Sequence, residues 1–161
     1  MRRNKEKRFR EFVERCRDTL WHVCVDYGLS DAWEPQDAFQ EVLVALWNDF
    51  DTLKETKAEK VWAYRVASHT MLRIKRKYSN RPQGETVEVD AEHVTTQDEN
   101  YNSLLQLIDA LDEDDTFVVR AYLDGFSYRE IAQMTGRSTG AVAMQLSRAK
   151  QKIRDSYENG F

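Results

Sequence analysis

The chain has 161 residues, of which 24 are lysine or arginine and 28 are aspartate or glutamate, so the net charge is −4. A chain of this length folds as one or two small domains. No run approaches the ~18 consecutive apolar residues of a membrane span, and the first ten residues are basic rather than apolar, so we expect neither membrane insertion nor secretion.

The charges are separated into blocks along the chain. Residues 60–81 hold seven basic side chains and no acidic one, whereas residues 82–116 hold eleven acidic side chains and no basic one. Residues 137–154 are again free of acid and carry five basic side chains. Basic segments of this kind indicate contact with a polyanion such as nucleic acid, even in a chain whose total charge is negative.

Three helices are predicted for the first half. Apolar residues recur at three- and four-residue spacing over residues 5–27, which predicts a helix with one buried stripe that residues 27–30 break. Pro35 suits the first position of a second helix, because that position needs no N–H donor, and the apolar period continues to Phe50. The same period predicts a third helix near residues 58–79.

Both cysteines, Cys16 and Cys24, lie on the first of these helices. Their spacing along a helix separates the Cα atoms by roughly 12 Å, whereas a disulfide needs less than about 7 Å. The thiols therefore cannot pair within the chain, and a reducing cytoplasm suits them. No histidine or further cysteine stands at a ligand spacing, so we expect no metal site and no cofactor.

A polar segment divides the chain. The acidic residues 82–102 show no sustained period, which predicts a linker. A helical apolar pattern resumes at residues 104–111, Asp112 is placed to cap the next helix, and Gly125 is placed to end it. No segment reads as a strand, so an all-α fold is predicted.

Residues 127–154 predict a helix-turn-helix. A capping box at Ser127 opens its first helix. Ala132 is small enough to let two helices approach, Gly136 can adopt the left-handed conformation of a tight turn, and the branched Val142 fixes the second helix.

The second helix of this motif is the candidate DNA-reading element. Its freedom from acid suits the major groove, with its N-terminal part at base edges and its C-terminal part beside phosphates. The alternative is a plain helical hairpin with solvated cations. The candidate DNA contacts are Arg137, Ser138, Thr139, Ala143, Gln145, Arg148 and Lys150.

Together these motifs resemble those of bacterial sigma factors. Residues 109–154 resemble sigma region 4. Residues 37–47, DAFQEVLVALW, are similar to the region 2 helix that docks on RNA polymerase, and residues 62–67, followed by a basic run, resemble the helix that handles the −10 promoter element. Regions 2 and 4 joined by a short linker are the layout of the extracytoplasmic-function group of the sigma-70 family.

The resemblance implies two small helical domains. It divides the chain into a region 2-like domain at 1–81, an acidic linker at 82–102 and a region 4-like helix-turn-helix domain at 103–161. We expect a sigma factor that binds core RNA polymerase and directs promoter-specific initiation, with the first domain melting the −10 element and the second reading the −35 element. No nucleophile and base are placed for catalysis, so an enzyme is not expected.

The resemblance also implies partners and contact residues. Core polymerase is expected to bind through its β′ clamp and β flap. The connection at residues 52–59 is expected to help capture a flipped −10 base, while Trp62 and Tyr64 either stack on bases or pack in the core. The implied polymerase contacts are Asp37, Gln40, Glu41 and Asn48, and the implied −10 contacts are Arg65, His69, Arg73, Arg76 and Lys77.

Two other functions fit part of the pattern. A stand-alone helix-turn-helix regulator would leave the basic residues 60–81 unexplained. A protein that sequesters polymerase without reading DNA fits the presence of Ala143 and Gln145 where relatives often carry cations. The acidic linker either imitates nucleic acid in the polymerase channel or is simply solvated. An anti-sigma factor is a common partner in this group, although no residue here identifies one.

Overall fold

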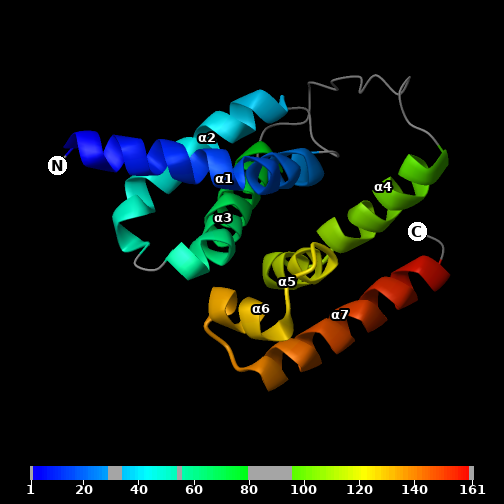
Figure 1. Ribbon diagram of the computed structural model, residues 1–161. Helices are drawn as coiled ribbons and strands as arrows, with labels where there is room; N and C mark the ends of the chain where they lie inside the picture. Colours follow the sequence, from blue (N-terminus) through cyan, green and yellow to red (C-terminus); the bar gives the residue numbers. More distant parts are fainter. Residues whose placement is uncertain (1, 29–33, 54–55, 80–95, 160–161) are drawn as a thin grey trace. The chain divides into compact units, whose positions relative to one another are not determined.

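The computed structural model describes residues 2–28, 34–53, 56–79 and 96–159, and all regular secondary structure in these ranges is helical (Figure 1). The prediction of an all-α fold is confirmed. The chain forms two compact units, Met1–Val89 and Asp90–Phe161. Among the described helices, none is long and apolar enough to cross a membrane.

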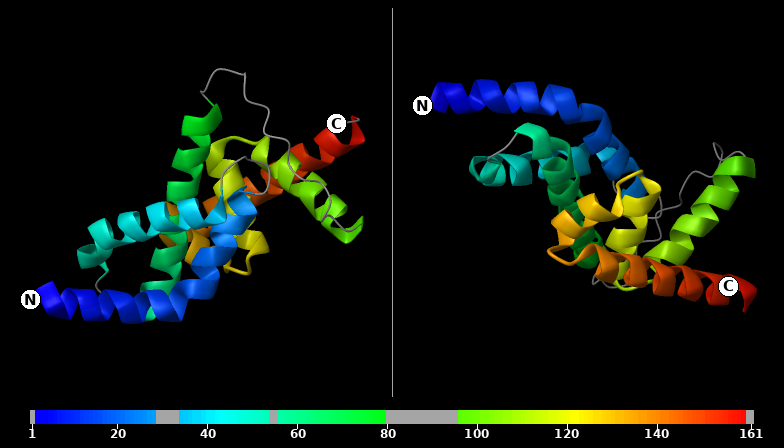
Figure 2. Two further views of the ribbon diagram at one scale, coloured as in Figure 1. Left: turned by 90° about the horizontal axis from the view of Figure 1, so that it is seen from above. Right: turned by 60° about the horizontal axis from the view of Figure 1, so that its bottom comes forward.

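The described residues of the first unit form three α-helices that pack pairwise against one another (Figures 1 and 2). As predicted, α1 ends at Gly28, and Pro35 occupies the first turn of α2. The elements are α1 Arg2–Gly28, α2 Pro35–Asp49, the 3-10 turns η1 Phe50–Thr52 and η2 Thr56–Ala58, and α3 Glu59–Ser79.

Aromatic rings fill the core of this unit. Phe12 lies edge-on to Trp62, with ring centroids 5.5 Å apart, and Phe9 meets both Trp47 and Phe50 at 5.2 Å. Each such pair adds about 0.5–1.5 kcal/mol beyond the burial of its area. The cluster joins all three helices, so the outward faces of α2 and α3 are held in a fixed relation to each other.

The two cysteines are free and buried, in agreement with the prediction that they do not pair. Burial raises the pKa of the Cys24 thiol to about 12. Burial, with a smaller effect of the Glu59 carboxylate, raises the pKa of the Cys16 thiol to about 11. Both side chains therefore stay protonated at neutral pH and act as small apolar groups.

In the second unit, the described residues 96–159 form four helices. The longest, α7, packs against α4, α5 and α6 (Figures 1 and 2). Ile108, Val118, Ile131 and Leu146 meet in a core from which solvent is excluded. The elements are α4 Thr96–Asp109, α5 Glu113–Leu123, α6 Tyr128–Thr135 and α7 Thr139–Glu158.

Local capping sets the boundaries of these helices. The Asp112 carboxylate accepts a hydrogen bond from the Asp115 N–H at 2.9 Å, as predicted for the start of α5. The capping box at the start of α6 is complete, because the Ser127 hydroxyl accepts from the Glu130 N–H at 3.1 Å and the Glu130 carboxylate accepts from the Ser127 N–H at 2.9 Å. Caps of this type contribute about 1 kcal/mol each.

The predicted linker is longer than the structure allows. Helix α4 begins at Thr96, so residues 96–102 belong to the helix and only the earlier part of the predicted 82–102 segment lies outside the described residues. Most residues in this first part of α4 are polar, so no apolar residues recur there at helical spacing. For this reason the sequence pattern does not predict the start of the helix.

Candidate nucleic-acid interface

The helix-turn-helix of the second unit consists of α6, a glycine turn and α7. Gly136 has φ 70° and ψ 20°, the left-handed conformation that the turn requires. Its N–H and that of Arg137 both donate to the Ala132 carbonyl oxygen, at 2.9 and 3.2 Å. Val142 is fully buried, and the Ser138 hydroxyl caps α7 by accepting a hydrogen bond from the Ala141 N–H at 3.1 Å. The predicted motif is therefore present in this chain.

Most of the predicted DNA contacts lie on the accessible side of α7 or in the turn before it. Thr139 and Arg148 are exposed, and Ala143 is half-buried. The Lys150 ammonium lies 4.5 Å from the centre of the Tyr122 ring, a cation–π contact that turns this cation toward α5.

Gln145 corrects the prediction. It was expected to face outward, but only 4% of it is exposed and both ends of its amide are engaged inside the unit. It lies three residues after Val142 and four before Ala149, both fully buried, so it belongs to the inner face of α7. This spacing was present in the sequence and would have placed it correctly.

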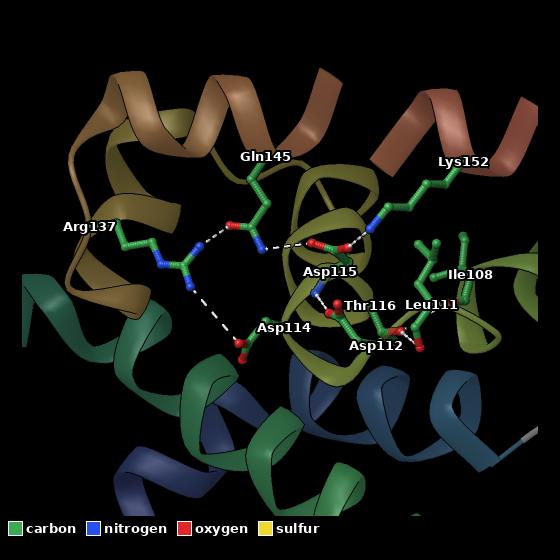
Figure 3. A network of polar contacts seen from close by, with 9 residues as sticks. All are labelled: Ile108, Leu111, Asp112, Asp114, Asp115, Thr116, Arg137, Gln145 and Lys152. Atoms are coloured by element: carbon green, nitrogen blue, oxygen red, sulfur yellow. Dashed lines mark hydrogen bonds and ion pairs between the residues drawn. The ribbon is translucent and has the colours of Figure 1, made fainter. Parts of the chain in front are cut away.

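A chain of polar contacts surrounds Gln145 (Figure 3). Arg137 Nη1 donates to Gln145 Oε1 at 2.7 Å, and Gln145 Nε2 donates to Asp115 Oδ1 at 2.9 Å. Lys152 Nζ donates to Asp115 Oδ2 at 3.1 Å. The second guanidinium nitrogen of Arg137 lies 3.9 Å from the Asp114 carboxylate. Arg137, a predicted DNA contact, and Lys152 are therefore both joined to the acidic start of α5.

The charge state of Asp115 follows from this network. Burial alone would raise the pKa of this carboxyl group. The hydrogen bonds from Gln145 and Lys152, together with the positive charges of Lys152 and Arg148, more than offset burial and hold the pKa of Asp115 below its usual range. The carboxylate is therefore ionised at neutral pH and can hold both of its donors.

Met144 is an exposed residue of α7 that the sequence pattern did not single out. It is 64% exposed, and it follows Gly140 by four residues and precedes Ser147 by three, so these three share the outward face of α7. Met144 therefore adds an apolar side chain to the accessible side of α7. A methionine in an apolar helical pattern reads as core, and for this reason the sequence did not single it out.

A basic stripe runs along α3 in the first unit. We call it the α3 stripe; it consists of Arg65, His69, Arg73, Arg76 and Lys77, whose spacing places them on one side of the helix. Lys57, in the η2 turn before this helix, is exposed as well. All five predicted −10 contacts are exposed and belong to the stripe: Arg65, His69, Arg73, Arg76 and Lys77.

The predicted polymerase contacts also share one face, on α2. An open groove of about 660 Å³ separates this face from part of the α3 stripe, with Arg73 and Lys77 on its far side. Val44, which is 60% exposed, lies in the same groove and was not selected from the sequence. The α2 side chains that line the groove include all four predicted contacts, Asp37, Gln40, Glu41 and Asn48.

The question of Trp62 and Tyr64 is settled by burial. Trp62 is 8% exposed and Tyr64 is 1% exposed, so both pack in the core of the first unit and neither presents a face on which a base could stack. Lys54, in the predicted base-capture connection at residues 52–59, lies outside the described residues.

The second unit also has an apolar groove of about 700 Å³ between α4, α5 and α7. Leu104, Leu123 and Tyr157 are among its lining side chains, and Lys150 and Arg154 add two cations. Leu123 and Tyr157 are exposed. A groove of this composition suits an amphipathic helix that carries acidic residues.

The fold and these surfaces define a two-unit, all-helical DNA-binding protein of the helix-turn-helix class. Two family models match the sequence in chain order: sigma-70 region 2 at residues 12–81 and sigma-70, region 4 at residues 101–153. The chain belongs to the sigma-70 family of sigma factors, with the two-region layout of the extracytoplasmic-function group. No curated protein matches the sequence significantly.

Solved structures share the fold at low sequence identity. The sigma factor RpoE, in complex with the anti-sigma factor NepR from Bartonella quintana, is 18% identical with a TM-score of 0.68, and the match covers 96% of this chain and 99% of that chain. CnrH, in complex with the cytosolic domain of CnrY, is 20% identical with a TM-score of 0.62, and the match covers 97% of this chain and 91% of that chain. At these identities the likeness concerns the fold.

Proposed function

We propose that this protein binds core RNA polymerase in the bacterial cytoplasm and directs promoter-specific transcription initiation. The observation that carries the proposal is the presence of regions 2 and 4 of a sigma factor in one chain, each with its own basic surface. A stand-alone regulator needs only the helix-turn-helix, and the exposed basic residues of the α3 stripe would then be unexplained.

In this proposal the second unit reads the −35 element. Helix α7 enters the major groove with the turn residue Arg137 beside the backbone and with Thr139, Ala143 and Met144 toward the bases. The exposure of Arg137, Thr139 and Met144 and the freedom of residues 137–154 from acid support this orientation. Gln145 is no longer among the proposed base contacts, because its amide is engaged inside the unit.

The first unit, in this proposal, handles the −10 element and docks on the polymerase. The α3 stripe supplies cations along the single strand, which needs such charges once its bases are unstacked. The outward face of α2 meets the β′ clamp, with Val44 as an apolar centre among polar contacts. Arg73 and Lys77 face the α2 side chains across the groove, so they lie where the two proposed surfaces meet.

Two further partners complete the proposal. The apolar groove of the second unit suits the β flap of the polymerase, because it combines an apolar lining with two cations. An anti-sigma factor is a further proposed partner. The RpoE structure contains the anti-sigma factor NepR, and the CnrH structure contains the cytosolic domain of CnrY. These complexes support proposing a protein of that kind as a partner of this chain.

Run-off transcription tests the function directly. Purified core polymerase, with and without the protein, is given a library of genomic promoter fragments, and we expect transcripts that depend on the protein and are lost when the −35 half of a template is scrambled. If no template is transcribed above the core background although the protein binds duplex DNA, the regulator function holds instead. If it binds polymerase but no DNA, it is a sequestering protein.

A further inference from the structure

Gln145 is a buried amide placed between an anion and a cation. Figure 3 shows its oxygen toward Arg137, in the turn between α6 and α7, and its nitrogen toward Asp115, near the start of α5. Asp115 and Gln145 lie 30 positions apart in the sequence, yet their side chains are 2.9 Å from each other. The contact therefore depends on the packing of α5 against α7.

The orientation of this amide is fixed from the anionic side. Asp115 is ionised and can only accept hydrogen bonds, so the Gln145 NH₂ group must face it. The amide oxygen is then left to face the guanidinium of Arg137, which can only donate. Lys152 holds the other oxygen of Asp115 at 3.1 Å, which keeps the carboxylate from turning away.

Arg137 is held at one end and accessible at the other. Its guanidinium is bound to Gln145 at 2.7 Å, while its side chain remains 45% exposed. The Asp114 carboxylate is 3.9 Å away and 82% exposed, so this ion pair is screened by water and restrains the arginine little. The hydrogen bond to the buried amide is therefore the contact that selects one arginine conformation.

We propose that Gln145 is a positioning residue for DNA binding, which holds the Arg137 guanidinium in the orientation that meets a phosphate beside the start of α7. The inference rests on the proposed promoter-binding function. A long side chain that is already ordered loses less freedom when it binds, and the saving corresponds to about fivefold in affinity for one arginine.

A double-mutant cycle on the full chain tests the inference. The variants are Arg137→Ala, Gln145→Met and their combination, each bound to core polymerase. The probe is a 30-base-pair duplex recovered from a random-sequence pool by core polymerase only when the unmodified protein is present. Gln106→Met, an exposed glutamine on α4, is the matched control. Circular dichroism checks the helix content of each variant. If Gln145→Met does not fold, Gln145→Asn keeps a buried amide that is one methylene too short to join both partners.

We expect Arg137→Ala to weaken binding about tenfold in the unmodified chain, as the loss of one charge-assisted hydrogen bond does. In the Gln145→Met background the same change should weaken binding only about twofold, while Gln106→Met should leave binding unchanged.

An equal loss from Arg137→Ala in both backgrounds overturns the positioning role and leaves the proposed DNA binding intact. No loss from Arg137→Ala overturns it as well, and removes Arg137 from the interface. If the pool yields no bound duplex, the proposed function itself fails.

Discussion

Replacing Gly136 by alanine tests the geometry on which the helix-turn-helix depends. The residue has φ 70°, and an L-residue in this conformation costs about 1–2 kcal/mol. No atom lies within 4 Å of the added Cβ, so no clash increases that cost. Alanine also restricts the unfolded chain, which returns about 0.4–1 kcal/mol. The net expectation for Gly136→Ala is a loss of about 1 kcal/mol of unfolding free energy.

The loss should be confined to the second unit. Urea unfolding followed by circular dichroism reports on both units, whereas tryptophan fluorescence reports on the first, because the chain has no tryptophan after Trp62. Gly136→Asn is the matched variant, since asparagine tolerates the left-handed conformation better than alanine and should lose less. If the alanine and asparagine variants unfold together with the unmodified protein, the turn does not require the left-handed conformation and the argument is wrong.

Three further predictions follow from the surfaces and the polar network. Glu41→Arg should weaken association with core polymerase at least tenfold in a pull-down titration, while Glu11→Arg on α1 should not; equal binding would remove the α2 face from the interface. Met144→Gln should change the base preference of selected promoters by about 1–3 kcal/mol at one −35 position, and an unchanged selection profile would show that Met144 reads no base. Because the pKa of Asp115 is lowered in the folded state, its stabilisation is full above the unfolded value of about 3.9 and is lost as pH falls through the folded value. The difference in unfolding free energy between the unmodified protein and Asp115→Asn should therefore shrink below about pH 4; a constant difference from pH 6 to 3 would contradict the network.

Features that depend on residues close together in the sequence could be predicted, and features that depend on the packing of distant helices could not. The capping box at Ser127 and the turn at Gly136 were predicted correctly, because each depends on residues within four positions. The burial of Gln145 could have been predicted from its spacing to Val142 and Ala149, but its partner Asp115 could not, because the two side chains meet only when α5 packs on α7. The start of α4 was missed because its first residues are polar, so no apolar period marks them as helical.

The candidate surfaces show the same division. Exposure of the α3 stripe and of the predicted α2 contacts follows from helical spacing alone. That Arg73 and Lys77 share a groove with the α2 face required the crossing of two helices, which no single period encodes. The sequence likewise left two alternatives for Trp62, and only the aromatic cluster formed with Phe12 decides between them.

The contacts made by the cations of the second unit bear on how the protein finds a promoter. Lys152 is paired with the Asp115 carboxylate and Arg137 lies 3.9 Å from the Asp114 carboxylate, so part of the positive charge of this surface is offset by acidic groups before any DNA arrives. Lys150 keeps its charge but lies over the Tyr122 ring. Few counterions are then released on random DNA, and residence there should be short. The second unit should then occupy its DNA site mainly when it is tethered there. A partner that already holds the first unit near a promoter raises the local concentration of the second unit at that DNA. The protein should therefore visit chromosomal DNA briefly on its own and stay only where a larger assembly holds it.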